Sequence, residues 1–112
     1  MEIQKRTVGE IQILDCSGSI TLGEGTSAVR NAVHDILAGG RSKIALNLAG
    51  VNYIDSAGVG ELVSAFASVN NKGGQLRLLH LTKRTRELLT LTKLLTVFQA
   101  FDTEQEVLAS FK

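Results

Sequence analysis

Strand-like and helix-like hydrophobic patterns alternate along this chain, with single or paired glycines between them as expected of turns. The strand patterns cover residues 3–8, 10–16, 43–49 and 75–79, with a short candidate edge strand at 97–98. The helix patterns cover residues 27–38, 57–70 and 84–94, and a fourth helix starts at Thr103. This order predicts an α/β fold in which right-handed crossovers pack helices against a sheet.

The size and charge of the chain narrow its class. Its 112 residues are the length of one domain, so we expect residues 1–112 to form a single domain. A hydrophobic content of 44% supports a buried core and argues against disorder. Twelve basic against eleven acidic residues leave a net charge of +1, so no strong field attracts nucleic acid or an anionic membrane.

Few residues could hold a metal ion or perform catalysis. Cys16 is the only cysteine, and the two histidines, His34 and His80, are far apart in the sequence. A disulfide and a Cys-rich or His-rich metal site are therefore not expected. We expect no metal, no cofactor and no catalytic residue. No apolar run is long enough to cross a membrane and no signal peptide is visible, so the expected location is the cytoplasm.

Two segments carry start signals for helices. Residues Gly18–Gly25 are predicted to be a loop, after which Thr26 or Ser27 can cap the helix at 27–38. Thr103-Glu-Gln-Glu106 fits a capping box, in which the side chain at each end satisfies the free N–H at the other.

A serine and glycine turn, Asn52–Glu61, follows the strand at 43–49 and opens the second helix. Ser56 is well placed to cap this helix, a role worth about 1 kcal/mol by itself. Gly58 and Gly60 fall in the first turn, where each costs up to about 1 kcal/mol relative to alanine. A cap does not need them, and bare backbone lets another molecule approach closely. A phosphate on Ser56 would lie near unpaired N–H groups, and beside Asp55 it would change the local surface charge by roughly −1.5 to −2.

Residues 43–62, KIALNLAGVNYIDSAGVGEL, resemble the signature of the anti-sigma factor antagonist family, which is built on the STAS domain. That signature is a hydrophobic strand, the motif D-S-[SA]-G-[LV]-G and an apolar helix. The segment GSITLG at 18–23 resembles a second landmark of the family, and DTEQEVLASF near the end resembles its last helix. The resemblance implies a STAS-type mixed sheet of four to five strands, with about four helices packed mainly on one face.

In that family the protein is a binder and a substrate rather than an enzyme. It binds an anti-sigma factor that is an ATP-dependent serine kinase, and this frees the sigma factor for transcription. The kinase phosphorylates the motif serine, here Ser56, the complex dissociates, and a phosphoserine phosphatase resets the system. We expect a monomer or weak dimer with no nucleic-acid or membrane partner. The resemblance implies these partner-binding residues: Thr21, Gly23, Glu24, Asp55, Ser56, Ala57, Gly58 and Gly60.

One position departs from the family pattern. Many antagonists carry an aspartate where this chain has Thr21, and that aspartate is associated with kinase contact. Its replacement favours a second hypothesis, in which the chain is a STAS scaffold subunit of a stress-sensing complex or a lipid-transporting ABC system and phosphorylation is optional.

Other candidate features carry less weight. Gly23-x-Gly25 lacks the remaining residues of a phosphate-binding loop, and a loop that contacts a partner is favoured. The run Lys83-Arg84-x-Arg86 is interpreted as a solvated helix face. Tyr53 either packs against the sheet or contacts a partner. A nucleotide-hydrolysing enzyme is disfavoured, because the residues that such chemistry needs are absent.

Overall fold

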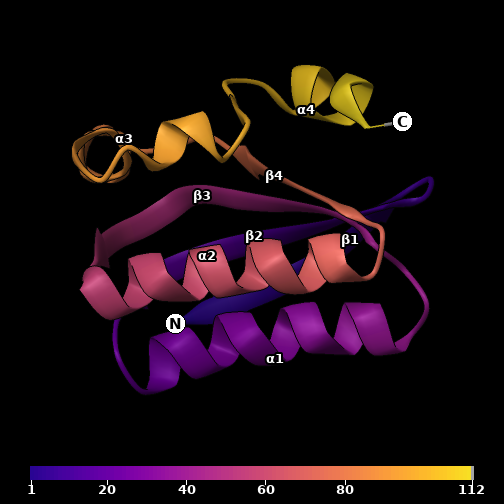
Figure 1. Ribbon diagram of the computed structural model, residues 1–112, viewed down its shortest axis with the longest axis horizontal. Coiled ribbons are helices and arrows are strands. Elements are labelled where there is room, and N and C mark those ends of the chain that lie inside the picture. Colours follow the sequence, from indigo (N-terminus) through magenta and orange to yellow (C-terminus); the bar gives the residue numbers. More distant parts are fainter. Residues whose placement is uncertain (112) are drawn as a thin grey trace.

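The computed structural model describes residues 1–111 as a mixed sheet with helices on both faces (Figure 1). Its strands are β1 (Glu2–Val8), β2 (Ile11–Ile20), β3 (Lys43–Ile54), β4 (Gln75–Leu79) and β5 (Ala100–Phe101). Its helices are α1 (Glu24–Ala38), α2 (Ser56–Asn71), α3 (Lys83–Leu91) and α4 (Glu104–Ser110), with a 3₁₀ turn at Leu94–Thr96.

The strands lie in the order β1-β2-β3-β4-β5, so neighbours in sequence are neighbours in space. β1 is antiparallel to β2, and all other pairs are parallel. This arrangement requires a helical crossover between each pair of successive parallel strands. The predicted mixed α/β sheet with about four helices is confirmed.

Each face of the sheet has its own apolar cluster. The larger cluster joins alternate residues of β2, β3 and β4 to α1 and α2, which lie side by side on one face (Figure 1). The intervening residues Ile13, Ala45 and Leu79 meet Val107 of α4 on the other face. The two long helices therefore share one face, as expected, and the short α4 covers part of the other.

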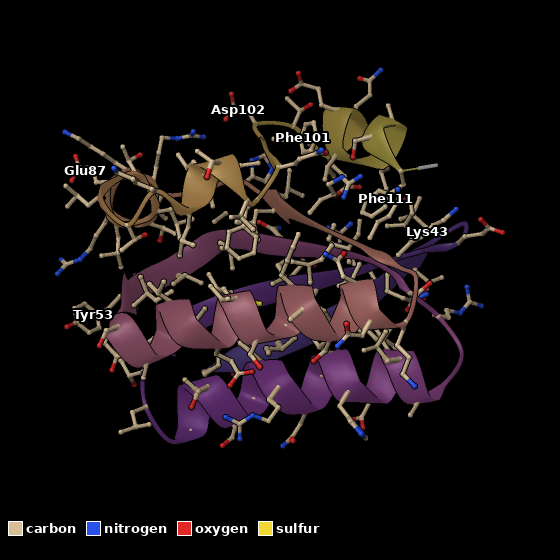
Figure 2. All side chains as sticks on the ribbon, in the orientation of Figure 1. Lys43, Tyr53, Glu87, Phe101, Asp102 and Phe111 are labelled. Atoms are coloured by element: carbon tan, nitrogen blue, oxygen red, sulfur yellow. The ribbon has the colours of Figure 1, made fainter. Side chains whose placement is uncertain are left out.

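The central strands run further than their hydrophobic patterns predicted. β2 continues through Ile20, so Gly18–Ile20 belong to a strand and not to the predicted loop. β3 continues to Ile54, and Ile20 pairs with Ile54 at the end of the shared ladder. The extension results from pairing between two strands far apart in sequence, which the local pattern of either strand does not show. Tyr53 lies at this end of β3, opposite the end that carries Lys43 (Figure 2).

The first helix starts earlier than expected, at Glu24 after the cap residue Gly23. Thr26 is therefore inside the helix, and its hydroxyl accepts a hydrogen bond from the Gly23 N–H at 3.2 Å. Neither Thr26 nor Ser27 is the cap that the sequence predicted.

The C-terminal third also differs in its boundaries. α3 ends at Leu91, and Lys93 takes a left-handed conformation with φ of 61° that interrupts the predicted helix. The last strand is at Ala100–Phe101 rather than at 97–98, because Phe98 is buried edge-on against Phe66 of α2.

The capping box of α4 is present in part. The Thr103 hydroxyl oxygen accepts a hydrogen bond from the Glu106 N–H at 3.1 Å. The Glu106 carboxylate accepts from the Thr103 hydroxyl at 3.0 Å instead of from its N–H. Within residues 1–111, no helix is both long and apolar enough to span a membrane.

Candidate functional site

Ser56 is the first residue of α2, where the chain leaves the end of β3. The residue is exposed, and its hydroxyl makes no hydrogen bond within the described part of the chain. The sequence predicted Ser56 as the cap of α2, and this prediction is wrong, because the cap is Asp55. Asp55 has the extended backbone that a cap needs, and its Oδ1 accepts from the Gly58 N–H at 2.7 Å. The serine hydroxyl is therefore free for another role.

Asp55 also joins the start of α2 to the segment between β2 and α1. Its Oδ2 accepts a hydrogen bond from the Leu22 N–H at 3.2 Å. The hydrogen bonds from the Gly58 and Leu22 amides lower the pKa of the Asp55 carboxyl below its usual value, because they stabilise the charged form. One ionised carboxylate thus fixes two segments that are 33 residues apart.

Replacing Asp55 with alanine is expected to lower the thermal midpoint at pH 7. Because the folded-state pKa is depressed, the carboxylate stabilises the fold above its unfolded-state pKa of about 3.9. That contribution is lost as the pH falls through the folded-state pKa, so the gap between variant and parent should close in acid. Thermal melts from pH 7 to pH 3 measure this gap. Asp35→Ala, at an exposed position on α1, is the control, and a gap as wide at pH 3 as at pH 7 would contradict the assignment.

The two glycines of the first turn have different surroundings. A Cβ on Gly58 would lie 2.1 Å from the Ile20 carbonyl oxygen, so the bare backbone there serves close packing inside the fold. A Cβ on Gly60 would meet nothing within 4 Å. The expectation that both glycines leave backbone open to another molecule is therefore wrong for Gly58, which is buried, and fits the exposed Gly60.

Three of the predicted partner-binding residues lie between the end of β2 and the first residue of α1, a segment that Asp55 joins to the start of α2. Thr21 is half-buried, and its carbonyl accepts the Thr26 N–H at 3.1 Å. Gly23 is exposed and has a φ of 105°, a conformation that favours glycine. Glu24 is exposed, and its Oε1 lies 3.4 Å from the Met1 amine. The Leu22–Asp55 hydrogen bond holds this segment close to Ser56. Ala57, the predicted residue that follows Ser56, is half-buried.

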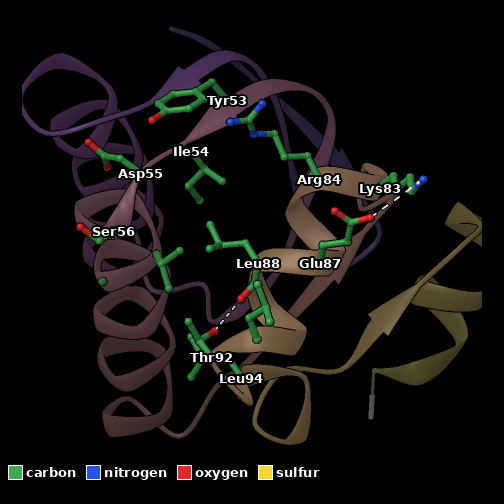
Figure 3. Close-up of a pocket in the computed structure, with 13 residues that line it drawn as sticks. Tyr53, Ile54, Asp55, Ser56, Lys83, Arg84, Glu87, Leu88, Thr92 and Leu94 are labelled. Carbon is green, nitrogen blue, oxygen red and sulfur yellow. Dashed lines mark hydrogen bonds and ion pairs between the residues drawn. The ribbon is translucent and has the colours of Figure 1, made fainter.

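An open groove of about 1180 Å³ separates the start of α2 from α3 (Figure 3). The α2 side of the groove is lined by Ser56, Val59 and Gly60. The residues of the opposite wall were not predicted from the sequence as part of the site. That wall consists of residues from α3 and the segment after it: Lys83, Arg84, Glu87, Leu88, Leu91, Thr92 and Leu94.

Two features of the groove settle questions that the sequence left open. The Arg84 guanidinium lies 4.9 Å from the centre of the Tyr53 ring, so Tyr53 is at the groove rim rather than packed under the sheet. The basic run that starts at Lys83 is exposed, as predicted, and two of its residues, Lys83 and Arg84, also border the groove. The sequence held one weak hint of an exposed leucine on this helix, because Leu88, Leu89 and Leu91 span about 160° around it, wider than a typical apolar stripe.

The groups around Ser56 have different surroundings. Asp55, the nearest carboxylate in sequence, is occupied by the Leu22 and Gly58 amides. In residues 1–111 no group of three or more His, Cys, Asp and Glu side chains could hold a metal ion. A phosphate on the exposed Ser56 hydroxyl would adjoin the Asp55 charge. Because Asp55 already takes the Gly58 N–H, the helix start is less free for a phosphate than the sequence suggested.

The STAS domain family model matches residues 2–107, and the chain belongs to that family. A comparison with curated proteins found no match.

Solved structures support the same fold. A candidate anti-sigma factor antagonist from Thermotoga maritima has a TM-score of 0.90 and 26% identity, over 97% of this chain and 93% of that one. The phosphorylated form of SpoIIAA, a Bacillus cell fate determinant, has a TM-score of 0.74 and 19% identity, over 96% and 97%. A sulfate transporter family protein from Wolinella succinogenes has a TM-score of 0.79 and 19% identity, over 94% and 87%. The chain thus has the STAS fold and close structural similarity to anti-sigma factor antagonists.

Proposed function

We propose that this STAS domain is a cytoplasmic anti-sigma factor antagonist whose binding is switched off by phosphorylation of Ser56. It binds an anti-sigma factor that is a serine kinase, which releases the sigma factor, and phosphorylation of Ser56 ends the binding. A phosphoserine phosphatase restores the active form. The observation that carries the proposal is the Ser56 hydroxyl, exposed and without a hydrogen bond at the start of α2. The family membership and the similarity to the Thermotoga maritima protein support it.

The switch follows from charge rather than from a change of fold. A phosphoserine at position 56 adds a charge of roughly −1.5 to −2 next to the Asp55 carboxylate. Asp55, and not Ser56, holds the cap of α2 and the Leu22 segment. The fold therefore keeps its contacts while the surface seen by the partner becomes strongly negative.

Incubation of the chain with its anti-sigma kinase and ATP is expected to place one phosphate on Ser56, detected by mass spectrometry. Ser56→Ala should bind the kinase and stay bound in ATP, whereas Ser56→Asp should bind weakly. Ser64→Ala is the matched control, since Ser64 is another exposed serine of α2 and its loss should leave the phosphate in place. Modification elsewhere with Ser56 unmodified would contradict the proposal.

A second candidate function is a STAS scaffold subunit that does not switch, in a stress-sensing complex or a lipid-transporting ABC system. The observation that favours it is Thr21, where many antagonists carry an aspartate. The two functions differ in assembly. A large homo-oligomer of the purified chain would favour the scaffold, and a monomer or weak dimer would favour the switch.

A further inference from the structure

Exposed apolar side chains gather around Ser56. The described residues leave six large apolar side chains exposed, and four of them lie near this serine: Leu22, Tyr53, Val63 and Leu91. The other two, Val8 and Val97, lie elsewhere and are less exposed than Leu22 and Leu91, at 37% and 44% against 79% and 80%.

Separate observations place these four side chains near the site. Tyr53 and Leu91 line the groove together with Ser56. Leu22 donates its N–H to Asp55, the residue before Ser56. Val63 follows Ser56 by seven residues on α2 and so lies on the same helix face. Apolar surface gathered in one place on a small protein marks an interaction site.

The two most exposed leucines are held by rigid parts of the fold. Leu22 is fixed through its backbone N–H, and Leu91 is the last residue of α3. An anchor whose backbone is already ordered loses less conformational entropy when a partner covers it. Leu22 and Leu91 are therefore suited to bind on opposite sides of Ser56.

The charges around this patch differ between its two sides. Glu24 is exposed beside Leu22, and its Oε1 lies 3.4 Å from the Met1 amine. On the side of α3, Lys83 is 4.0 Å from Glu87, whereas Arg84 rests on Tyr53 and pairs with no carboxylate in the described residues. The carboxylate of Glu24 thus lies on the Leu22 side of the patch, and the guanidinium of Arg84, beside Tyr53, lies on the α3 side without a carboxylate partner in residues 1–111.

We propose that Leu22 and Leu91 are the apolar anchors through which this chain docks onto an aliphatic surface of its serine kinase. The kinase surface carries a cation that faces Glu24 and an anion that faces Arg84. This inference rests on the proposed function, because a kinase that modifies Ser56 must cover the residues around it. A typical interface of about 800 Å² on each partner can include both leucines. A phosphate on Ser56 then lies in the middle of an apolar contact, where loss of its hydration opposes docking.

The test uses the full chain with Ser56→Ala, so that phosphorylation cannot release the partner. Leu22→Asp and Leu91→Asp are added separately, with Leu22→Ala and Leu91→Ala as milder changes. Val97→Asp is the matched control, because Val97 is exposed outside the patch. Each protein captures partners from an extract of the source organism. A captured ATP-binding serine kinase is then purified, and its affinity for each variant is measured.

We expect the parent and Val97→Asp to capture the kinase. Leu22→Asp and Leu91→Asp should each reduce the affinity for the purified kinase about tenfold or more. Equal affinity for all variants would overturn the inference and leave the proposed function intact. Absence of a serine kinase from every capture would overturn both. Sedimentation of the chain alone adds another outcome, because a stable dimer that Leu91→Asp dissociates would make a second copy the occupant and overturn the inference.

The charge pattern has its own test with the same purified kinase. Glu24→Lys and Arg84→Glu should each weaken binding and change its salt dependence. Arg86→Glu is the control, because Arg86 lies on α3 outside the groove and pairs with Asp102 at 3.3 Å. An equal loss with Arg86→Glu would show a general charge effect and would overturn the assigned orientation.

Discussion

Gly58→Ala is expected to destabilise the protein by roughly 3 kcal/mol, the upper range for overpacking a core. The new Cβ would lie 2.1 Å from the Ile20 carbonyl oxygen and 2.7 Å from Cγ1 of Ile54. Ile20 and Ile54 pair at the ends of β2 and β3, so neither atom can move away easily. The start of α2 must shift instead, and Ser56 with it. Urea denaturation measures the loss in the free energy of unfolding.

Gly60→Ala is the matched control, two residues along the same helix. Its Cβ would meet nothing within 4 Å, and alanine favours a helix over glycine by up to about 1 kcal/mol. Gly60→Ala should therefore be neutral or slightly stabilising. Equal destabilisation by both changes would mean that backbone conformation, and not contact with Ile20, requires glycine at position 58.

Arg30→Ala is expected to cost about 3 kcal/mol, because it leaves a buried carboxylate without its cation. Arg30 of α1 donates to Oε1 of Glu61 on α2, from Nη2 at 2.7 Å and from Nε at 3.2 Å. The Glu61 side chain is 6% exposed and that of Arg30 is 61% exposed. Removal of Glu61 should therefore cost less, since Arg30 remains largely in water. Thermal or urea unfolding of both single variants measures this asymmetry.

The double variant Arg30→Ala with Glu61→Leu tests the cause. If the unpaired buried charge is responsible, the leucine should recover much of the lost stability. Arg86→Ala is the control, because its ion pair with Asp102 is exposed on both sides and such pairs contribute at most about 1 kcal/mol. A loss from Arg86→Ala as large as that from Arg30→Ala would contradict the special role given to Glu61.

These two positions also bear on function, because both orient the start of α2. Gly58 sets how closely α2 approaches the end of β2, and Glu61 joins α2 to α1. Asp55 connects the same turn to Leu22. The contacts of Gly58, Glu61 and Asp55 thus hold the start of α2 in place around the exposed Ser56. This fits a switch in which phosphorylation changes the surface charge and not the fold.

Much of the site could be predicted from the sequence. The placement of Ser56 between a buried strand and an apolar helix follows from the hydrophobic pattern of residues 43–62 alone. The identity of the cap did not follow, because both Asp55 and Ser56 are residue types that cap helices. Only the backbone geometry of Asp55 and its bond to the Gly58 N–H distinguish them.

The groove wall formed by α3 could not be predicted, although the helix itself was. Arg84 meets Tyr53, 31 residues earlier, only because β3 and α3 come together at one end of the sheet. The same holds for the longer β2 and β3, whose last residues pair across 34 positions of sequence.

The sequence by itself determined the order of strands and helices, the presence of a buried core and the serine that starts α2. Each of these depends on neighbouring residues, through hydrophobic period, turn chemistry and helix propensity. The tertiary structure decided which residue caps α2, why Gly58 must be glycine, and which side chains surround Ser56. Those features depend on contacts between distant segments, whose distances are set only when the sheet is assembled and the helices pack against it.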